Sequence, residues 1–303
     1  MERLVQDNQQ AGDSVITASA PGKINLYFAV GPKLDNGYHE VCSVYLALNL
    51  REQVSVDFAD QLSIGVTGSL SAGQLAGVPT DQTNLVVSAA RLITDKTLRF
   101  EIDKQVPVAG GMGGGSADAA AALCATGELV GSSAKIDAVR LGADVPFAIM
   151  GGVALGMGVG EKLTPLELNT ELHVVLITTN AGLSTPMVYS HLDELREKDG
   201  LVAEFSPPAP TDLIDALAAG DIASIARLAY NDLQRAALSL KPELQETIDA
   251  ALNAGALTAL VSGSGPTVFA IAESAESAER IAKRFGSSAL ITSGPSAGAR
   301  LEN

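Results

Sequence analysis

Apolar and polar residues alternate with a period of two along much of the first half of the chain. Leu98, Phe100 and Ile102 alternate with Arg99, Glu101 and Asp103, as in a strand with one buried face. Further runs rich in β-branched and apolar residues, separated by Pro-Gly and Asp-Asn-Gly turn signals, predict strands over Val15–Ala18, Lys23–Val30, Cys42–Leu50, Val54–Phe58, Leu62–Thr67 and Gly151–Gly156. Helical spacing predicts helices over Asn84–Thr94, Ser116–Leu129 and Ala134–Leu141.

After Pro165 longer helices alternate with short strands. We predict helices over Thr211–Ala219, Asp221–Tyr230, Pro242–Asn253 and Ser274–Phe285, and strands over Leu172–Thr178, Leu257–Val261, Thr267–Ala272 and Ala289–Thr292. The change in pattern predicts an α+β protein of two domains, over residues 15–165 and 166–303. Residues 1–14 are polar and without periodicity, which predicts a disordered leader. The polar stretch from His191 to Pro210 predicts a mobile excursion near a cleft.

The composition of the chain indicates which kinds of binding partner to expect. The chain has 35 acidic and 20 basic residues, a formal charge of −15, which argues against nucleic acid or an anionic membrane as partner. No long apolar run or signal peptide is present in the sequence, so we expect a cytoplasmic protein. We also expect a monomer or weak homodimer. Cys42 and Cys124 are expected to be buried free thiols, and with only three histidines a Cys/His zinc site is not expected.

A glycine-rich run, Pro107-Val-Ala-Gly-Gly-Met-Gly-Gly-Gly-Ser-Ala117, lies between the strand that ends near Asp103 and the helix that begins near Ser116. Glycine has no Cβ, so an anion can approach the main-chain N–H groups of such a loop. The free amides and positive dipole of the following helix would face the same anion. This arrangement predicts a phosphate site, against the alternative of a merely flexible turn.

The loop lacks both common nucleotide fingerprints. It has no lysine, as a P-loop requires, and Ser116 stands where the dinucleotide fingerprint has its third glycine. The phosphate charge must therefore be met by backbone, a metal ion and residues elsewhere in the chain.

Two further short stretches accompany this loop: Ala20-Pro-Gly-Lys-Ile-Asn-Leu26 and Val261-Ser-Gly-Ser-Gly-Pro-Thr267. In this order, the three resemble the motifs of the GHMP small-molecule kinases over Val15 to Thr292. The resemblance implies a ribosomal-protein-S5-domain-2-like N-terminal domain, a ferredoxin-like C-terminal α/β domain and a cleft between them. Within the superfamily, Asn36-Gly-Tyr-His-Glu40 and Leu141-Gly-Ala-Asp-Val-Pro-Phe147 resemble the members that phosphorylate an alcohol linked to cytidine diphosphate in non-mevalonate isoprenoid biosynthesis.

The resemblance implies roles for individual residues on the ATP side. Asp144 would accept the proton of the attacking hydroxyl, and Lys23 would keep Asp144 ionised and stabilise charge on the phosphoryl oxygens. Taken singly, Asp144 could be a cap before Pro146 and Lys23 a solvated lysine. Ser116 would lie near Mg²⁺, and Asn84 near the adenine, although Asn84 is equally suited to cap a helix. The ATP phosphates would be held by Pro107, Val108, Ala109, Gly110, Gly111, Met112, Gly113, Gly114, Gly115, Ser116 and Ala117.

The alcohol substrate would lie on the other side of the cleft. A pyrimidine can stack on Tyr38 and Tyr189 and hydrogen-bond to His39, although Tyr38 and His39 could be part of a bare turn and Tyr189 part of the core. Thr185 would lie beside Tyr189, and Asn25 near the reacting hydroxyl. Gly263, Ser264 and Gly265 would approach the substrate phosphates, unless their turn binds nothing.

Other functions remain open on these residues. A homoserine or mevalonate-type kinase would keep the glycine loop but has no need of tyrosines around a pyrimidine. A catalytically silent protein would bind ATP without transferring phosphate. Gln234 stands where related kinases often have glutamate, which leaves the role of that position open.

Overall fold

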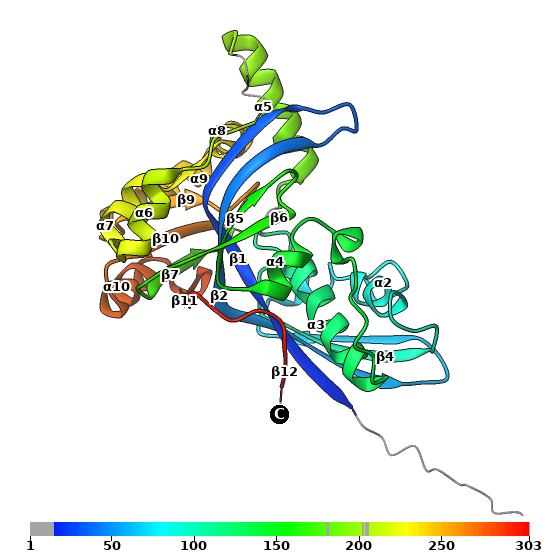
Figure 1. Cartoon of the computed structure of the whole chain (residues 1–303). Coiled ribbons are helices and arrows are strands. Elements are labelled where there is room, and N and C mark those ends of the chain that lie inside the picture. The colour runs from blue at the N-terminus through cyan, green and yellow to red at the C-terminus, as the bar shows by residue number, and fades with distance from the viewer. Residues whose placement is uncertain (1–14, 180–181, 202, 204–205, 303) are drawn as a thin grey trace, which may run out of the picture.

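The computed structural model describes residues 15–179, 182–201, 203 and 206–302 (Figure 1). The leader predicted over residues 1–14 lies outside these ranges. Within them, no helix is long and apolar enough to cross a bilayer.

The first sheet is built on two long antiparallel strands, β1 and β2, which run the length of the molecule in Figure 1. Its central order is β12-β1-β2-β4-β3, with β5 and β6 continuing from β2 and β8 pairing with β1. The strands are β1 (Ile16–Lys33), β2 (His39–Phe58), β3 (Ser63–Gly68), β4 (Leu98–Lys104), β5 (Val153–Met157), β6 (Lys162–Leu166), β8 (Tyr230–Asn231) and β12 (Arg300–Leu301).

The second sheet is antiparallel, in the order β11-β7-β10-β9. Its strands are β7 (Leu172–Ile177), β9 (Thr258–Val261), β10 (Val268–Ala272) and β11 (Ala289–Gly294). Val175 and Ala270 pack in one core cluster, with helices from residues 185–199 and 233–285. Val174 and Phe269 pack in another, with β1, β2 and the helices between residues 211 and 228. Both faces are therefore buried, which explains why these strands are continuous apolar runs.

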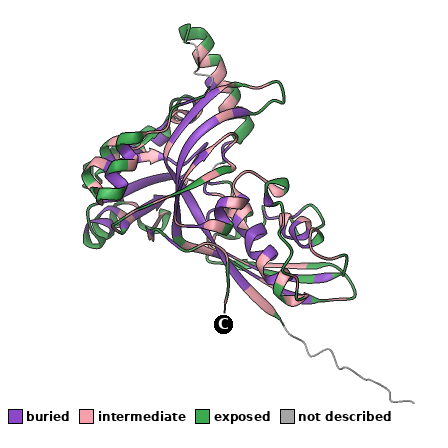
Figure 2. Cartoon of the chain, in the orientation of Figure 1, coloured by how far each residue is buried: buried purple, intermediate pink, exposed green. Residues whose placement is uncertain are grey.

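The helices cover the two sheets separately, as Figure 1 shows. In the first half they are α1 (Ala72–Leu75), α2 (Leu85–Arg91), α3 (Gly114–Leu129), the 3₁₀ turn η1 (Ala138–Leu141) and α4 (Val145–Met150). In the second half they are α5 (Thr185–Asp199), α6 (Thr211–Ala219), α7 (Ile222–Leu228), α8 (Leu233–Leu240), α9 (Glu243–Asn253), α10 (Ala275–Phe285) and the 3₁₀ turn η2 (Gly286–Ser288). The alanine-rich α3 packs on β1 and β2, and its small side chains let the backbones approach closely. Figure 2 shows burial concentrated along the β1–β2 ribbon and on the helix faces turned toward it.

The two halves of the chain are interlaced. The short strands β8 and β12 come from the second half and pair with different parts of β1, at Tyr27 and Ala18 respectively. The expected domain boundary after residue 165 stays a prediction.

Four predictions of local structure are wrong. The two strands expected on either side of Pro21-Gly22 are one strand, β1, in which the register shifts between Pro21 and Lys23. Proline has no N–H to donate, and a bulge tolerates it within a sheet. The two strands expected on either side of residues 51–53 are likewise one continuous strand, β2. The helix expected from Ala134 is only η1, because within that 3₁₀ turn only Ala138 is buried.

The fourth error is the first part of the excursion expected from His191 to Pro210; residues 202, 204 and 205 of that stretch lie outside the described residues. The chain is helical there to Asp199, as the second half of α5, which ends at Gly200 with φ +65°. Only Val188 and Leu192 of this helix are buried, so its sequence is too polar to show a core-facing pattern. The sequence analysis also did not predict helices α1, α4 and α8, the first half of α5, or the strands β6, β8 and β12.

Candidate functional site

The glycine-rich run forms the predicted loop between β4 and α3. Helix α3 begins at Gly114, two residues earlier than expected, and its N-cap Gly113 has φ +68°. Such a conformation favours glycine, and a glycine cap leaves the amides of the first turn open to a ligand. Met112 is 1% exposed and packs with Ile24, Leu26 and Val106, so the loop is anchored to the core at its middle.

The loop needs glycine for a second reason, which is its contact with the turn at residues 262–267. A Cβ at Gly111 would overlap the carbonyl oxygen of Ser262, and a Cβ at Gly110 would lie 2.7 Å from Thr267 Oγ1. Ser262 Oγ also donates to the Gly111 carbonyl at 3.2 Å. The two glycine-bearing stretches, from opposite halves of the chain, are therefore packed backbone to backbone.

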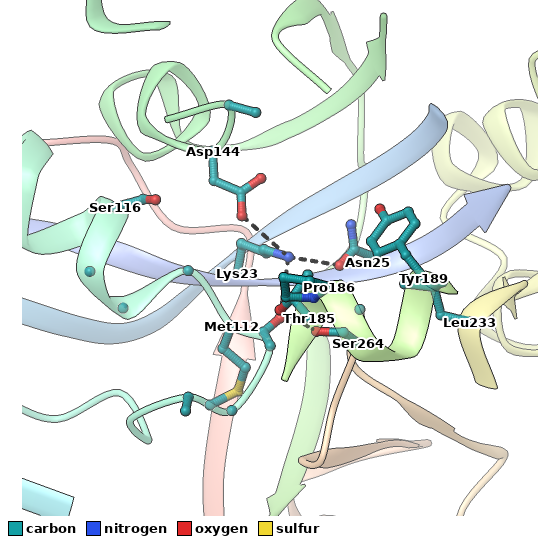
Figure 3. Close-up of a pocket in the computed structure, with 18 of the residues that line it drawn as sticks. Lys23, Asn25, Met112, Ser116, Asp144, Thr185, Pro186, Tyr189, Leu233 and Ser264 are labelled. Carbon is teal, nitrogen blue, oxygen red and sulfur yellow. Dashed lines mark hydrogen bonds and ion pairs between the residues drawn. The ribbon is translucent and has the colours of Figure 1, made fainter. Parts of the chain in front are cut away.

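Lys23 lies where this loop, β1 and α4 meet (Figure 3). Its Nζ donates to Asn25 Oδ1 at 2.8 Å and to the Gly111 carbonyl at 3.2 Å, and lies 3.6 Å from Asp144 Oδ2. Asn25 is held in turn by its Nδ2, which donates to Ser43 Oγ at 2.7 Å. The Lys23 side chain is 10% exposed and that of Asp144 31% exposed, so the carboxylate is open on the cavity side.

Asp144 lies two residues after Gly142, which has φ +151°, and directly before the short helix α4. Asp144 is the N-cap of α4 by position, but its side chain makes no capping hydrogen bond. Its carboxylate is therefore not needed to cap the start of the helix, which leaves it free for chemistry.

The residues expected around the pyrimidine come together at the start of β2 and on α5. The rings of His39 and Tyr189 lie 5.0 Å apart between centroids, tilted by 35°. His39 is buried, whereas Tyr38 is 64% exposed and has a free face. Burial raises the pKa of Tyr189, and the negative charge of Asp144 raises it further, so its phenol stays protonated at neutral pH.

The turn between β9 and β10 is fixed by three side chains. Asn231 Nδ2 donates to the carbonyls of Val261 and Gly263, each at 2.8 Å. Gln234 Oε1 accepts the Val261 amide at 3.0 Å, so the side chain at this position holds the end of β9 before the turn. A glutamate there could accept the same N–H. Ser264 Oγ lies 2.8 Å from Thr185 Oγ1, so the turn is also joined to the first residue of α5.

One cavity of about 900 Å³ connects these parts. All the predicted site residues line it except Ala117 and Gly265. Ala117 faces the core from α3, and the Gly265 amide donates back to Ser262 within the turn. Asn84 lines the cavity and also caps α2, with Oδ1 accepting the Val86 amide at 3.1 Å, while its place near the adenine stays a prediction. Ser116 lines the cavity, and no hydrogen bond joins its hydroxyl to the other described residues.

The sequence reasoning missed a buried charge cluster beneath the glycine loop. Lys104 Nζ contacts Glu52 Oε1 at 2.5 Å and Asp118 Oδ2 at 2.7 Å, and each of the three side chains is at most 5% exposed. A signal was present, because Lys104 continues the buried face of β4 after Leu98, Phe100 and Ile102. Lys104 thereby joins β2, β4 and α3 at the start of the loop.

The sequence analysis also missed Tyr45, which lies near Lys23, and Asp193, which lies near His39. Tyr45 is buried, stacks on Phe147 with centroids 4.9 Å apart, and places its ring 5.7 Å from Lys23 Nζ. Burial raises the pKa of its phenol, and Asp144 adds to the shift. Asp193 contacts His39. Tyr45 lies in an apolar run and Asp193 in a polar one, so neither stood out in the sequence.

Among the described residues, no group of three or more histidine, cysteine, aspartate or glutamate side chains is placed to hold an ion.

Comparison with known proteins gives matches over both halves of the chain. Residues 84–152 match the model of the GHMP kinases N-terminal domain, and residues 213–291 match that of the GHMP kinases C-terminal domain. The chain is 42% identical to a 4-diphosphocytidyl-2-C-methyl-D-erythritol kinase of Pseudarthrobacter chlorophenolicus, over 94% of each chain. It is 44% identical to the enzyme of that name in Rhodococcus jostii, over 95% of each chain.

Among solved structures, the chain resembles a 4-(cytidine 5'-diphospho)-2C-methyl-D-erythritol kinase with a TM-score of 0.70 and 31% identity, over 91% of this chain and 98% of that one. A homoserine kinase from Cytophaga hutchinsonii has a TM-score of 0.67 at 19% identity, over 99% of this chain and 100% of that one. At 19% identity, the similarity to this homoserine kinase shows the fold alone.

Proposed function

The chain belongs to the GHMP kinases and, among them, to the family of the 4-diphosphocytidyl-2-C-methyl-D-erythritol kinases, and we propose that Lys23 and Asp144 perform the phosphoryl transfer of that family here. The reaction is the ATP-dependent phosphorylation of the 2-hydroxyl of 4-(cytidine 5'-diphospho)-2-C-methyl-D-erythritol, a step of non-mevalonate isoprenoid biosynthesis. The observation that supports the assignment of residues is the position of the Lys23–Asp144 pair, 3.6 Å apart, between the glycine loop and the His39–Tyr189 pair.

The transfer needs two substrates held end to end. The open amides at the start of α3 would bind the ATP phosphates, since the loop offers main-chain donors and the positive end of a 16-residue helix. Asn84 would contact the adenine from the edge of the same cavity. Tyr38, His39 and Tyr189 would hold the cytosine on the far side, and Asn25 would hold the hydroxyl end of the alcohol.

Asp144 would accept the proton of the 2-hydroxyl while the alcohol oxygen forms its bond to the γ-phosphorus. The bond from that phosphorus to the bridging oxygen of ATP breaks, and ADP leaves with the electron pair. Lys23 would stabilise the negative charge that spreads over the phosphoryl oxygens. Its hydrogen bonds to Asn25 and to the Gly111 carbonyl hold the ammonium in place before the substrates arrive.

We propose Mg²⁺ as the accompanying ion, with Ser116 as its contact on the protein. Mg²⁺ keeps several waters and takes few protein ligands when substrate phosphates are present, so a single hydroxyl without a partner fits this site. Bound with ATP, Mg²⁺ would neutralise charge on the β- and γ-phosphates.

We also propose that the chain works as a monomer or weak homodimer. Both sheets of one chain already bring the glycine loop, the Lys23–Asp144 pair and the pyrimidine residues into one cavity, so the site needs no residue from a partner. Sedimentation at two protein concentrations tests this, and an obligate larger oligomer would contradict it.

The decisive experiment is incubation with ATP, Mg²⁺ and the cytidylyl-methylerythritol substrate, followed by mass detection of one added phosphate. Homoserine and mevalonate serve as competing acceptors, and CDP as a competitor of the expected substrate. Phosphorylation of homoserine or mevalonate, without inhibition by CDP, would support the rival kinases. ATP binding with no transfer to any of these alcohols would indicate a catalytically silent protein.

A further inference from the structure

The carboxylate of Asp193 contacts the buried ring of His39. His39 Nε2 lies 3.0 Å from Asp193 Oδ1 and 3.1 Å from Oδ2. Asp193 is four residues after Tyr189 on α5, so the two side chains share a helix face and meet His39 together. The His39 side chain is 4% exposed, whereas the Asp193 side chain is 33% exposed at the cavity edge.

The contact has a consequence for the proton on the ring. An ionised carboxylate can only accept hydrogen bonds, so His39 Nε2 must carry the hydrogen. In a neutral imidazole the other nitrogen, Nδ1, is then an acceptor, because the partner of one ring nitrogen sets the role of the second. No hydrogen bond from the described residues occupies Nδ1.

An acceptor at this position distinguishes the two common pyrimidines. Cytosine carries an exocyclic amino group that donates, whereas uracil and thymine carry a carbonyl oxygen that accepts at the same ring position. An unprotonated Nδ1 can pair with the amine and would face the carbonyl of uracil with a repulsive lone pair. A polar site left unpaired in this way discriminates strongly between otherwise similar ligands.

We propose that Asp193 is a positioning residue that fixes the orientation and tautomer of His39, so that Nδ1 accepts a hydrogen bond from the amino group of a cytosine and disfavours uracil. This inference rests on the proposed function, because it assumes that the cytidine end of the substrate lies against His39. Asp193 touches the ring of His39 and takes no part in the transfer itself.

The test compares Asp193→Ala and Asp193→Asn with Glu194→Ala. Glu194 is the matched control because it is the next residue on α5 and also contacts a histidine, His191, at 2.9 Å, but it is exposed and does not line the cavity. Dissociation constants of CDP and UDP are measured by calorimetry for each protein, and kcat and KM for the cytidylyl substrate are measured separately. The nitrogen chemical shifts of the His39 ring report its tautomer.

In Asp193→Ala we expect the preference for CDP over UDP to fall about tenfold and KM to rise by a similar factor, with kcat within about twofold of wild type. The nitrogen shifts should show the hydrogen on Nε2 in the wild type and a mixture of tautomers in the variant. Asp193→Asn should recover part of the preference, since its amide oxygen can accept the same Nε2 hydrogen. Glu194→Ala should match the wild type.

An unchanged CDP-to-UDP ratio in Asp193→Ala would overturn the inference, as would a wild-type ring with its hydrogen on Nδ1. These readouts need no turnover. A wild-type protein that binds CDP but phosphorylates no cytidylyl alcohol would therefore refute the proposed function separately from this inference.

Discussion

The carbonyl oxygen of Met112, in the middle of the glycine loop, accepts a hydrogen bond from the backbone amide of Lys23 at 3.0 Å. The loop and the strand that carries the lysine are thus joined through the main chain. Lys23 Nζ adds a second link, to the Gly111 carbonyl at 3.2 Å. The loop has no lysine of its own, and β1 holds Lys23 against it. In the proposed mechanism this lysine supplies the positive charge that the loop lacks.

The first prediction concerns the two charged residues of the proposed mechanism. Asp144→Asn keeps the shape of the side chain but removes the proton acceptor, so we expect kcat to fall by about 10²–10⁴-fold. Lys23→Met keeps the aliphatic stem but removes the charge, and we expect a loss of about 10²–10³-fold. Steady-state kinetics on folded protein gives both values, with ATP affinity measured separately. Near-normal turnover in either variant would remove that residue from its role.

The second prediction separates backbone strain from the position of Lys23. At Gly113, with φ +68°, a Cβ would lie 3.3 Å from Lys23 Cγ and 3.7 Å from Asp144 Oδ2. At Gly131, with φ +64°, a Cβ would meet nothing within 4 Å. Alanine at either position costs about 1–2 kcal/mol in the left-handed conformation. We expect similar losses of stability in thermal unfolding, but a fall in kcat for Gly113→Ala alone. Equal activities would show that the lysine tolerates the displacement.

The sequence predicted the parts of the site that depend on local pattern. The alternation through Ile102, the glycine run and the alanine-rich segment after it predicted strand, loop and helix, because each is set by nearest neighbours along the chain. Resemblance to family motifs identified Lys23, Asp144, His39 and Tyr189 as site residues. The fold brings all four to one cavity.

The rest could not be predicted, because it depends on contacts between distant segments. Pro21-Gly22 is typical of a turn, and only pairing with β2 on one side and the bulge there make it part of one strand. The polar sequence of α5 gives no core pattern, so the contact of Asp193 with His39 could not be predicted. The need for glycine at Gly111 arises from the carbonyl of Ser262, in the other half of the chain.

The third prediction concerns the turn at residues 262–265. Asn231→Ala removes both hydrogen bonds that hold the carbonyls of Val261 and Gly263. Losing a buried partner costs about 1–3 kcal/mol, and the turn should loosen against the glycine loop, raising the KM for both substrates. Gln234→Glu is the control, because a carboxylate can accept the Val261 amide as Gln234 does, and its kinetics should match wild type. If Gln234→Glu were the more damaging variant, the hydrogen bond would not explain that position.

The last prediction is the pH dependence of stability that follows from Glu52. Its side chain is 0% exposed, and Lys104 must balance both Glu52 and Asp118. Burial is the largest effect and, with the negative charge of Asp118, raises the pKa of Glu52 from 4.5 to about 8, against the opposing effect of Lys104. Between pH 4.5 and about pH 8, Glu52 therefore holds a proton in the folded protein that it has released in the unfolded chain. The free energy of unfolding falls as pH rises through this range.

The slope for one such proton is about 1.4 kcal/mol per pH unit, and Glu52→Gln removes it. Glutamine can still accept from Lys104 and from the Gln105 amide, which now donates to Glu52 Oε2 at 2.8 Å. Urea unfolding from pH 5 to pH 8 should therefore show Glu52→Gln gaining on the wild type as pH rises. Asp81→Asn is the control, because hydrogen bonds from Thr83 lower the pKa of Asp81 below 3.8, so its difference from wild type should stay constant over this range. A constant difference for Glu52→Gln as well would mean that Glu52 keeps one protonation state throughout, with Lys104 outweighing its burial.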